Sequence, residues 1–195
     1  VGITTDPNNL NPWLATQFQA VNVLETMYNS LTQFDKDLKV VPSLAESWTT
    51  SADGKTVTLK LRQGVKFADG SAFDATDVKF TLDKIKDPAT KAVAAASLAS
   101  VTAVTVKDPA TVELTLSGPD AALASNLASL NLSILPSEAT EATFTTTPNG
   151  TGPFAYVSRT PNQSLSVKRN DAFWGDKAKV AKLEFRVIPE ESAAT

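Results

Sequence analysis

The sequence has no cysteine and no histidine among its 195 residues. Without cysteine the chain forms no disulfide and offers no thiolate to a metal or a substrate. Without histidine it lacks imidazole ligands and the general base of Ser-His-Asp and Cys-His catalysis. The two absences exclude most metal sites and most hydrolytic mechanisms. The lack of free thiols is also compatible with an oxidising, extracytoplasmic compartment.

Long apolar runs and basic clusters are missing too. No stretch approaches the roughly 20 apolar residues that cross a membrane. The formal net charge is −3, and the lysines and arginines are scattered, so we expect no nucleic-acid partner. The first residues show no basic region followed by an apolar segment. We therefore expect that a signal peptide was removed or never present.

The apolar and polar residues that are present follow a pattern typical of a mixed α/β (α+β) domain. Hydrophobic residues make up 42% of the chain, enough for a buried core. Alternation over residues 56–61 places Val57, Leu59 and Leu61 on the buried face of a strand. Asp74 and Asp77 are spaced as the N-cap and third residue of a helix that stops before Pro88. Further helices are expected at 20–30, 91–100 and 120–130, and further strands at 1–5, 38–41, 101–106, 111–116, 154–158, 165–169 and 183–188. Residues 136–148 are expected to form a loop with one helical turn, and residues 189–195 to begin a helix.

Several blocks, in a fixed order, carry a resemblance to a known family. The most specific is Pro-Ser-Leu-Ala-Glu-Ser-Trp at 42–48, followed by the blocks at 53–62 and 64–78. Two supporting blocks are the second hairpin at 108–116 and the stretches at 150–154 and 168–175. Together they resemble the N-terminal portion of the peptide/nickel (oligopeptide/dipeptide) class of extracellular solute-binding proteins, which serve ABC importers.

This resemblance implies a periplasmic-binding-protein-like fold of type II. Residues 1–41 and 149–195 would form part of the first lobe, which is discontinuous and incomplete. Residues 42–148 would form an inserted, β-rich subdomain. Family members are more than twice as long and close with a second lobe, which is absent from this chain. The chain is therefore expected to be about half of a clamp.

The loop after the first strand is the first candidate for ligand binding, because ligands gather beyond the carboxyl ends of strands in such sheets. The resemblance implies contacts from Thr16, Gln17, Phe18 and Gln19. The two glutamines are suited to hydrogen bonds with a peptide backbone, while Trp13 and Phe18 are suited to walling a side-chain pocket. The alternative is an ordinary surface loop with one aromatic residue packed down.

The second candidate is the crossing at 149–153, where Gly150 and Thr151 would approach a ligand closely; the alternative is a plain connector. Trp174 resembles a sugar-stacking platform, but packing against the adjacent strand is the favoured interpretation. Asn131-Leu132-Ser133 is a formal glycosylation sequon, without meaning in a bacterial protein.

The sequence therefore predicts a substrate-binding component of an ABC transporter, which captures peptides or similar small solutes and delivers them to membrane permease subunits. No catalytic residue, metal site or cofactor is expected, although a chelated metal held through its carrier stays open. The full-length protein is expected to be a periplasmic or extracellular monomer; a lipid anchor on a cysteine upstream of Val1 stays open. The alternatives are a surface or sensory binding protein not coupled to import, and an enzyme built from carboxylates, Ser, Thr or Lys.

Overall fold

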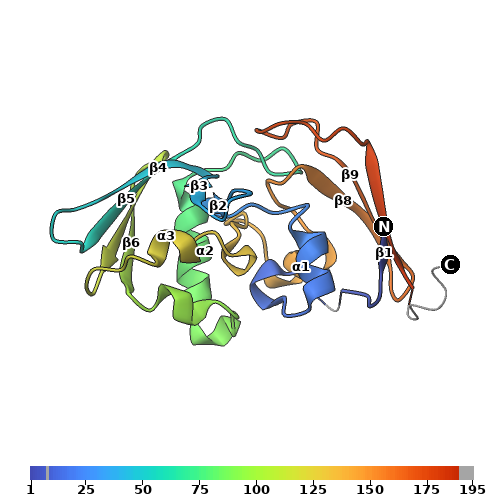
Figure 1. Cartoon of the computed structure of the whole chain (residues 1–195), viewed down its shortest axis with the longest axis horizontal. Helices are drawn as coiled ribbons and strands as arrows, with labels where there is room; N and C mark the ends of the chain where they lie inside the picture. The colour runs from blue at the N-terminus through green and yellow to red at the C-terminus, as the bar shows by residue number, and fades with distance from the viewer. Residues whose placement is uncertain (8, 189–195) are drawn as a thin grey trace.

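The computed structural model describes residues 1–7 and 9–188 and places most of the strands in two four-stranded sheets. The elements, with η for 3-10 helices, are β1 (Gly2–Ile3), η1 (Pro12–Leu14), α1 (Phe18–Leu24), β2 (Thr32–Phe34), β3 (Val40–Pro42), β4 (Ala45–Thr50), β5 (Thr56–Leu61), α2 (Ala75–Lys86), η2 (Pro88–Thr90), η3 (Ala95–Leu98), β6 (Val101–Asp108), β7 (Thr111–Leu116), α3 (Leu123–Asn126), η4 (Leu130–Leu132), α4 (Glu141–Thr146), β8 (Phe154–Thr160), β9 (Ser164–Arg169) and β10 (Lys182–Val187). Figure 1 shows the two sheets at opposite ends of the molecule, with α1 and α2 between them.

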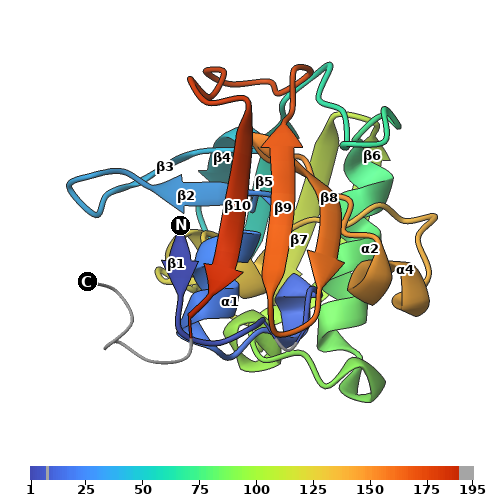
Figure 2. The ribbon, with the colours of Figure 1, turned by 90° about the vertical axis from the view of Figure 1, so that its right-hand side faces the viewer.

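The first sheet, here called the terminal sheet, joins the two ends of the described chain. Its strand order is β1-β10-β9-β8; β1 runs parallel to β10, and the remaining pairs are antiparallel. In Figure 2 this sheet faces the viewer and α1 lies behind it. The sheet thereby brings the beginning of the chain beside residues more than 180 positions later, as in the pairing of Gly2 with Arg186.

The second sheet, here called the central sheet because its strands come from the middle of the sequence, is wholly antiparallel with the order β4-β5-β7-β6. The predicted alternation in β5 is confirmed, because Val57, Leu59 and Leu61 are buried. The predicted start of α2 is also confirmed. Asp74 accepts the N–H of Thr76, and Asp77 accepts the N–H of Asp74, which completes a capping box.

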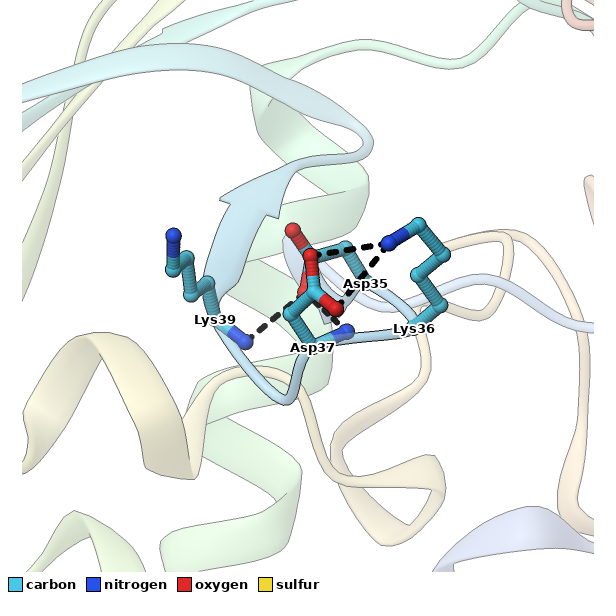
Figure 3. A network of polar contacts seen from close by, with 4 residues as sticks. All are labelled: Asp35, Lys36, Asp37 and Lys39. Carbon is cyan, nitrogen blue, oxygen red and sulfur yellow. Dashed lines mark hydrogen bonds and ion pairs between the residues drawn. The ribbon is translucent and has the colours of Figure 1, made fainter.

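A short hairpin, β2–β3, forms a separate two-stranded sheet and projects past the edge of the terminal sheet (Figure 2). Figure 3 shows its turn, where the Asp35 carboxylate accepts the backbone N–H groups of Asp37 and Lys39 at 2.8 and 2.9 Å. Leu38 adopts a left-handed conformation there, with φ at 58°, and is 80% exposed. The side-chain hydrogen bonds of Asp35 therefore hold a turn that leucine does not favour.

Three helix predictions were too long. The helix expected at 20–30 ends at Leu24. Beyond it, the carbonyls of Met27 and Thr26 accept hydrogen bonds from the backbone N–H groups of Gly152 and Phe154, which draw the chain out of the helical path. The alanine-rich stretch 91–100 forms only the short η3, and the helix expected at 120–130 is reduced to α3. Strand β2 was not predicted. The helix start expected at 189–195 lies outside the described residues.

One hydrophobic core runs from the terminal sheet to the central sheet. It includes Leu24 and Met27 from the α1 region, Leu82 and Ile85 from α2, and Val167 from β9. Among the described residues, no helix is long and apolar enough to span a membrane.

Candidate functional site: the loop after the first strand

The loop that follows β1 starts at a largely buried ion pair. Arg159, in β8, donates through Nε and Nη2 to the two carboxylate oxygens of Asp6, at 3.2 and 2.6 Å. The backbone N–H of Asn162 donates to the same carboxylate at 2.9 Å. Burial disfavours the charged carboxylate, but the hydrogen bonds from Arg159 and Asn162 outweigh burial and keep the pKa of Asp6 below its ordinary value. The start of the loop is thus fastened to the β8–β9 turn.

Two asparagine side chains shape the middle of the loop. Asn9 accepts the backbone N–H of Asn11 at 2.8 Å, and Asn11 accepts the backbone N–H of Trp13 at 3.0 Å. The second bond caps η1, and Pro12 supplies a fixed φ at its first position. Asn9, Asn11 and Pro12 therefore build a defined turn in the middle of the loop.

Trp13 is almost wholly buried. Its side chain is 1% exposed, its indole Nε1 donates to the carbonyl of Ser133 at 2.9 Å, and its ring packs 5.3 Å from Phe144 and 6.2 Å from Phe80, measured between centroids. These contacts make Trp13 an anchor of the loop. The same three aromatic residues line a cavity of about 280 Å³, and the role of Trp13 as the wall of a ligand pocket stays a prediction.

Directly after this anchor, the other predicted residues of the loop come to the surface. Thr16 is exposed, Gln17 and Gln19 are half-buried, and the Phe18 side chain is 73% exposed. Gln19 donates to the Thr4 hydroxyl at 2.9 Å, which ties the start of α1 back to the end of β1. The row from Thr16 to Gln19 presents amide and hydroxyl groups beside one large apolar ring. Such a row can hydrogen-bond a peptide backbone and cover one apolar side chain.

Gly150 and Thr151 have a packing role. A Cβ on Gly150 would lie 2.2 Å from the Met27 carbonyl oxygen and 2.5 Å from Cδ1 of Tyr28. Thr151 is fully buried, and its hydroxyl donates to Oδ1 of Asn29 at 3.1 Å. The close approach that glycine permits is thus made to the protein's own backbone, and we correct the ligand contact expected from these two residues to internal packing.

Trp174 is half-buried, in agreement with the packing interpretation. The Arg62 guanidinium lies over its ring, 4.4 Å from the centroid, and its Nε1 donates to Oδ1 of Asn29 at 3.2 Å. The ring of Phe173 lies 5.1 Å from it. One face of the indole is therefore occupied by a cation and is closed to stacking with a sugar.

One neighbour of the loop was missed in the sequence. The backbone N–H of Val93 donates to the carbonyl of Trp13 at 2.9 Å, and the Val93 side chain is 50% exposed. The turn between η2 and η3 therefore lies beside the candidate binding loop. No sequence signal pointed to this contact, because it joins residues 80 positions apart through backbone atoms.

Within residues 1–7 and 9–188, no group of three or more Asp or Glu side chains is placed to hold a metal ion. A cavity of about 450 Å³ lies between β8 and the segment 136–149, and it contains none of the residues from Thr16 to Gln19. The loop thus offers hydrogen bonding and apolar contact as its means of recognition.

Comparison with known proteins identifies the family. The profile of the bacterial extracellular solute-binding proteins, family 5 (middle region), matches residues 39–195. The chain belongs to this family. The resemblance seen in the sequence and the expected type II periplasmic-binding-protein fold are both confirmed.

Relatives within family 5 carry different ligands. A glutathione-binding protein, GsiB, from Pectobacterium atrosepticum is 34% identical over 181 residues, which cover 90% of this chain and 34% of the relative. The structure of NikZ from Campylobacter jejuni in complex with Ni(L-His) matches with a TM-score of 0.90 at 28% identity, covering 99% of this chain and 39% of that chain. The periplasmic binding protein DppA from Helicobacter pylori, in complex with the peptide STSA, matches with a TM-score of 0.90 at 26% identity, covering 99% and 43%. The chain spans about a third of the length of the curated relatives it matches.

Proposed function

We propose that this chain is part of the extracytoplasmic substrate-binding component of an ABC importer, and that it binds a short peptide or a peptide-like solute. Family 5 membership supports the general role. The observation that carries the proposal is the row from Thr16 to Gln19. It puts an exposed aromatic side chain and polar groups on a loop that is anchored ahead of the row by the Asp6–Arg159 ion pair and by the buried Trp13.

The mechanism follows from a clamp of two lobes. Residues 1–41 and 149–195 are proposed as part of the first lobe, and 42–148 as a subdomain inserted into it. The ligand would be enclosed against a second lobe that this chain does not contain. Binding would shift an equilibrium between open and closed forms, and the closed form would dock on the permease. No bond is made or broken in this cycle, so a catalytic group is not required.

Peptides and peptide-like solutes suit the row chemically. Gln17 and Gln19 carry both donors and acceptors, which complement the N–H and C=O groups of any peptide whatever its side chains. Phe18 offers apolar contact without selecting one residue type. The ligand of GsiB, glutathione, is itself a tripeptide, so reduced glutathione is the first solute to test, followed by a tetrapeptide and by a nickel–histidine chelate.

The test is calorimetry on the full-length protein with these three solutes. We expect micromolar or tighter affinity for at least one of them. Phe18→Ala should weaken that affinity about tenfold, the equivalent of ~1.4 kcal/mol. Phe34→Ala is the matched control, because Phe34 is also exposed, at 49%, but lies on the β2–β3 hairpin; its affinity should equal that of the wild type.

Two further results bear on the half-clamp. The 195-residue chain alone should bind these solutes weakly or not at all, and micromolar binding by it would show that one lobe suffices. Failure of every solute to bind the full-length protein would contradict the transport role.

Location and partners belong to the same proposal. We place the protein in the periplasm or on the outer face of the membrane, as a monomer, with a lipid anchor on a cysteine upstream of this chain in organisms that use one. A sensory or surface-binding role would share the binding step but not the permease. Loss of solute uptake in a strain lacking the gene supports import; normal uptake with an altered response to the solute supports sensing.

A further inference from the structure

The candidate binding loop is held chiefly by residues far from it in the sequence. The carbonyl of Trp13 accepts the N–H of Val93, and the Trp13 indole donates to Ser133. The carbonyls of Pro12 and Ala15, one at each end of the η1 turn, accept hydrogen bonds at 2.6 and 3.0 Å from the same atom, Nδ2 of Asn131. The segment 93–133 thus hydrogen-bonds the loop at Pro12, Trp13 and Ala15.

The chemistry of Asn131 matches this task. A carboxamide NH₂ group has two hydrogens, so a single side chain can satisfy two carbonyl oxygens at once. The position of Asn131 is itself fixed, because its backbone N–H donates to the Ser129 hydroxyl at 3.2 Å, the N-cap of η4. In the sequence Asn131 stood out only as part of a sequon, and its actual partners lie more than 110 positions earlier in the chain.

The two hydrogen bonds of Asn131 act at the point where the loop reaches the surface. Ala15 is buried, whereas Thr16, the next residue, is exposed. The helix α1 begins only two residues later, at Phe18. The hydrogen bond to the Ala15 carbonyl therefore fixes the peptide plane between Ala15 and Thr16, and with it the direction in which the row from Thr16 to Gln19 emerges.

We propose that Asn131 is a positioning residue for ligand binding. Its side chain holds the loop in the conformation that binds solute but does not itself contact the ligand. Through Asn131, the segment 42–148 thus helps to set the shape of the site. This inference rests on the proposed function. A loop that reaches its binding conformation only part of the time binds with an affinity reduced by that fraction. Loss of the two hydrogen bonds from Asn131 should therefore weaken binding even where the protein remains folded.

The decisive variant is Asn131→Asp in the full-length protein. It keeps the shape of the side chain and replaces both donors by acceptors that repel the two carbonyls. Asn126→Asp is the matched control, because the amide of Asn126 is also half-buried and also donates to a carbonyl, that of Ser97 at 3.1 Å, within the same segment. A loss of general stability would appear in both variants, whereas a positioning effect belongs to Asn131 alone.

The first readout needs no ligand. Hydrogen exchange followed by mass spectrometry should show the hydrogen-bonded amides of Trp13, Leu14, Ala15 and Val93 exchanging about tenfold faster in Asn131→Asp, and at the wild-type rate in Asn126→Asp. The second readout is the dissociation constant for reduced glutathione and for the tetrapeptide Ser-Thr-Ser-Ala, which should rise about tenfold in Asn131→Asp alone. As the pH falls and the introduced carboxyl becomes protonated, it regains one donor. For each solute, the ratio of the variant's dissociation constant to that of the wild type should then move back toward one.

Unchanged exchange in Asn131→Asp, or equal acceleration in Asn126→Asp, would overturn the inference. Binding by the wild type with an unchanged dissociation constant in Asn131→Asp would overturn it while the proposed function stands. If the wild type binds only the nickel–histidine chelate, the dissociation constants are compared for that solute. If none of the three solutes binds the wild type, the proposed function fails and the ligand-positioning role fails with it, even where faster exchange shows that Asn131 holds the loop.

Discussion

Replacement of Gly150 by alanine would place a methyl group where the backbone of the turn after α1 already lies. The added Cβ would stand 2.2 Å from the Met27 carbonyl oxygen, whereas ordinary contacts begin at 3.4 Å. One of the two segments must therefore move by about 1 Å. The Met27 carbonyl cannot move freely, because it accepts the N–H of Gly152 at 2.9 Å.

The expected cost is about 2–4 kcal/mol. Overpacking of a well-packed site costs about 1–3 kcal/mol, and loss of a buried hydrogen bond adds about 1 kcal/mol. For a chain of this length, each 1 kcal/mol lowers the melting temperature by roughly 2–4 °C. Thermal unfolding followed by circular dichroism should thus show Gly150→Ala melting roughly 10 °C below the wild type.

Gly118→Ala is the control for this experiment. A Cβ at Gly118 meets no atom within 4 Å, and its φ is not positive. Alanine there should leave stability unchanged or raise it by about 0.4–1 kcal/mol, through the lower entropy of the unfolded chain. A melting temperature of Gly150→Ala equal to that of the wild type, together with weaker solute binding, would refute the packing role and favour the ligand contact that the sequence predicted.

Two further substitutions test the frame of the loop and the β2–β3 hairpin. Asp6→Asn should lower stability at pH 7 by about 2 kcal/mol, because it breaks a largely buried ion pair. The pKa of Asp6 lies below its ordinary value, so the ion pair stabilises the fold above about pH 4, and this contribution is lost as the pH falls through the lowered pKa. Urea unfolding should show that the wild type is more stable than Asp6→Asn at neutral pH and that this difference shrinks in acid. A constant difference in stability across that pH range would contradict this origin. Leu38→Asn should raise stability by about 0.5–1 kcal/mol, because asparagine tolerates the left-handed backbone at this position and the leucine side chain is 80% exposed with little packing to lose; a lower melting temperature would show that Leu38 packs against a partner.

The parts of the fold that the sequence predicted well are those that local chemistry determines. Asp74 and Asp77 cap α2 through atoms within three residues of each other, and the alternation of β5 needs only one buried face. The alanine-rich stretch 91–100 shows the limit. Alanine favours helix, but Lys91 adopts a left-handed conformation, with φ at 53°, and the N–H of Val93 is given to Trp13. A tertiary hydrogen bond there replaces the helical one, and no local sequence pattern predicts this tertiary bond.

The candidate site divides in the same way. The sequence could place Thr16 to Gln19 in a loop next to a helix, and Thr16 and Phe18 are indeed exposed; ligand contact by this row stays a prediction. The sequence could not identify what holds the row, because Arg159, Val93 and Asn131 reach the loop from three distant parts of the chain. The burial of Trp13 was missed for a related reason. An aromatic residue in a loop can face solvent or the core, and the position of its partner, the Ser133 carbonyl, is not visible in the sequence.

Three of the contacts that hold the loop are made to its own backbone carbonyls. The loop is fixed by backbone carbonyls at Pro12, Trp13 and Ala15, and a carbonyl accepts the same hydrogen bond whatever side chain its residue carries. Substitutions of the Thr16 and Phe18 side chains should therefore leave these three hydrogen bonds in place, whereas the Gln19 side chain also ties the start of α1 to Thr4. The groups that hold the loop and the proposed ligand-contacting row are adjacent in sequence but separate in chemistry.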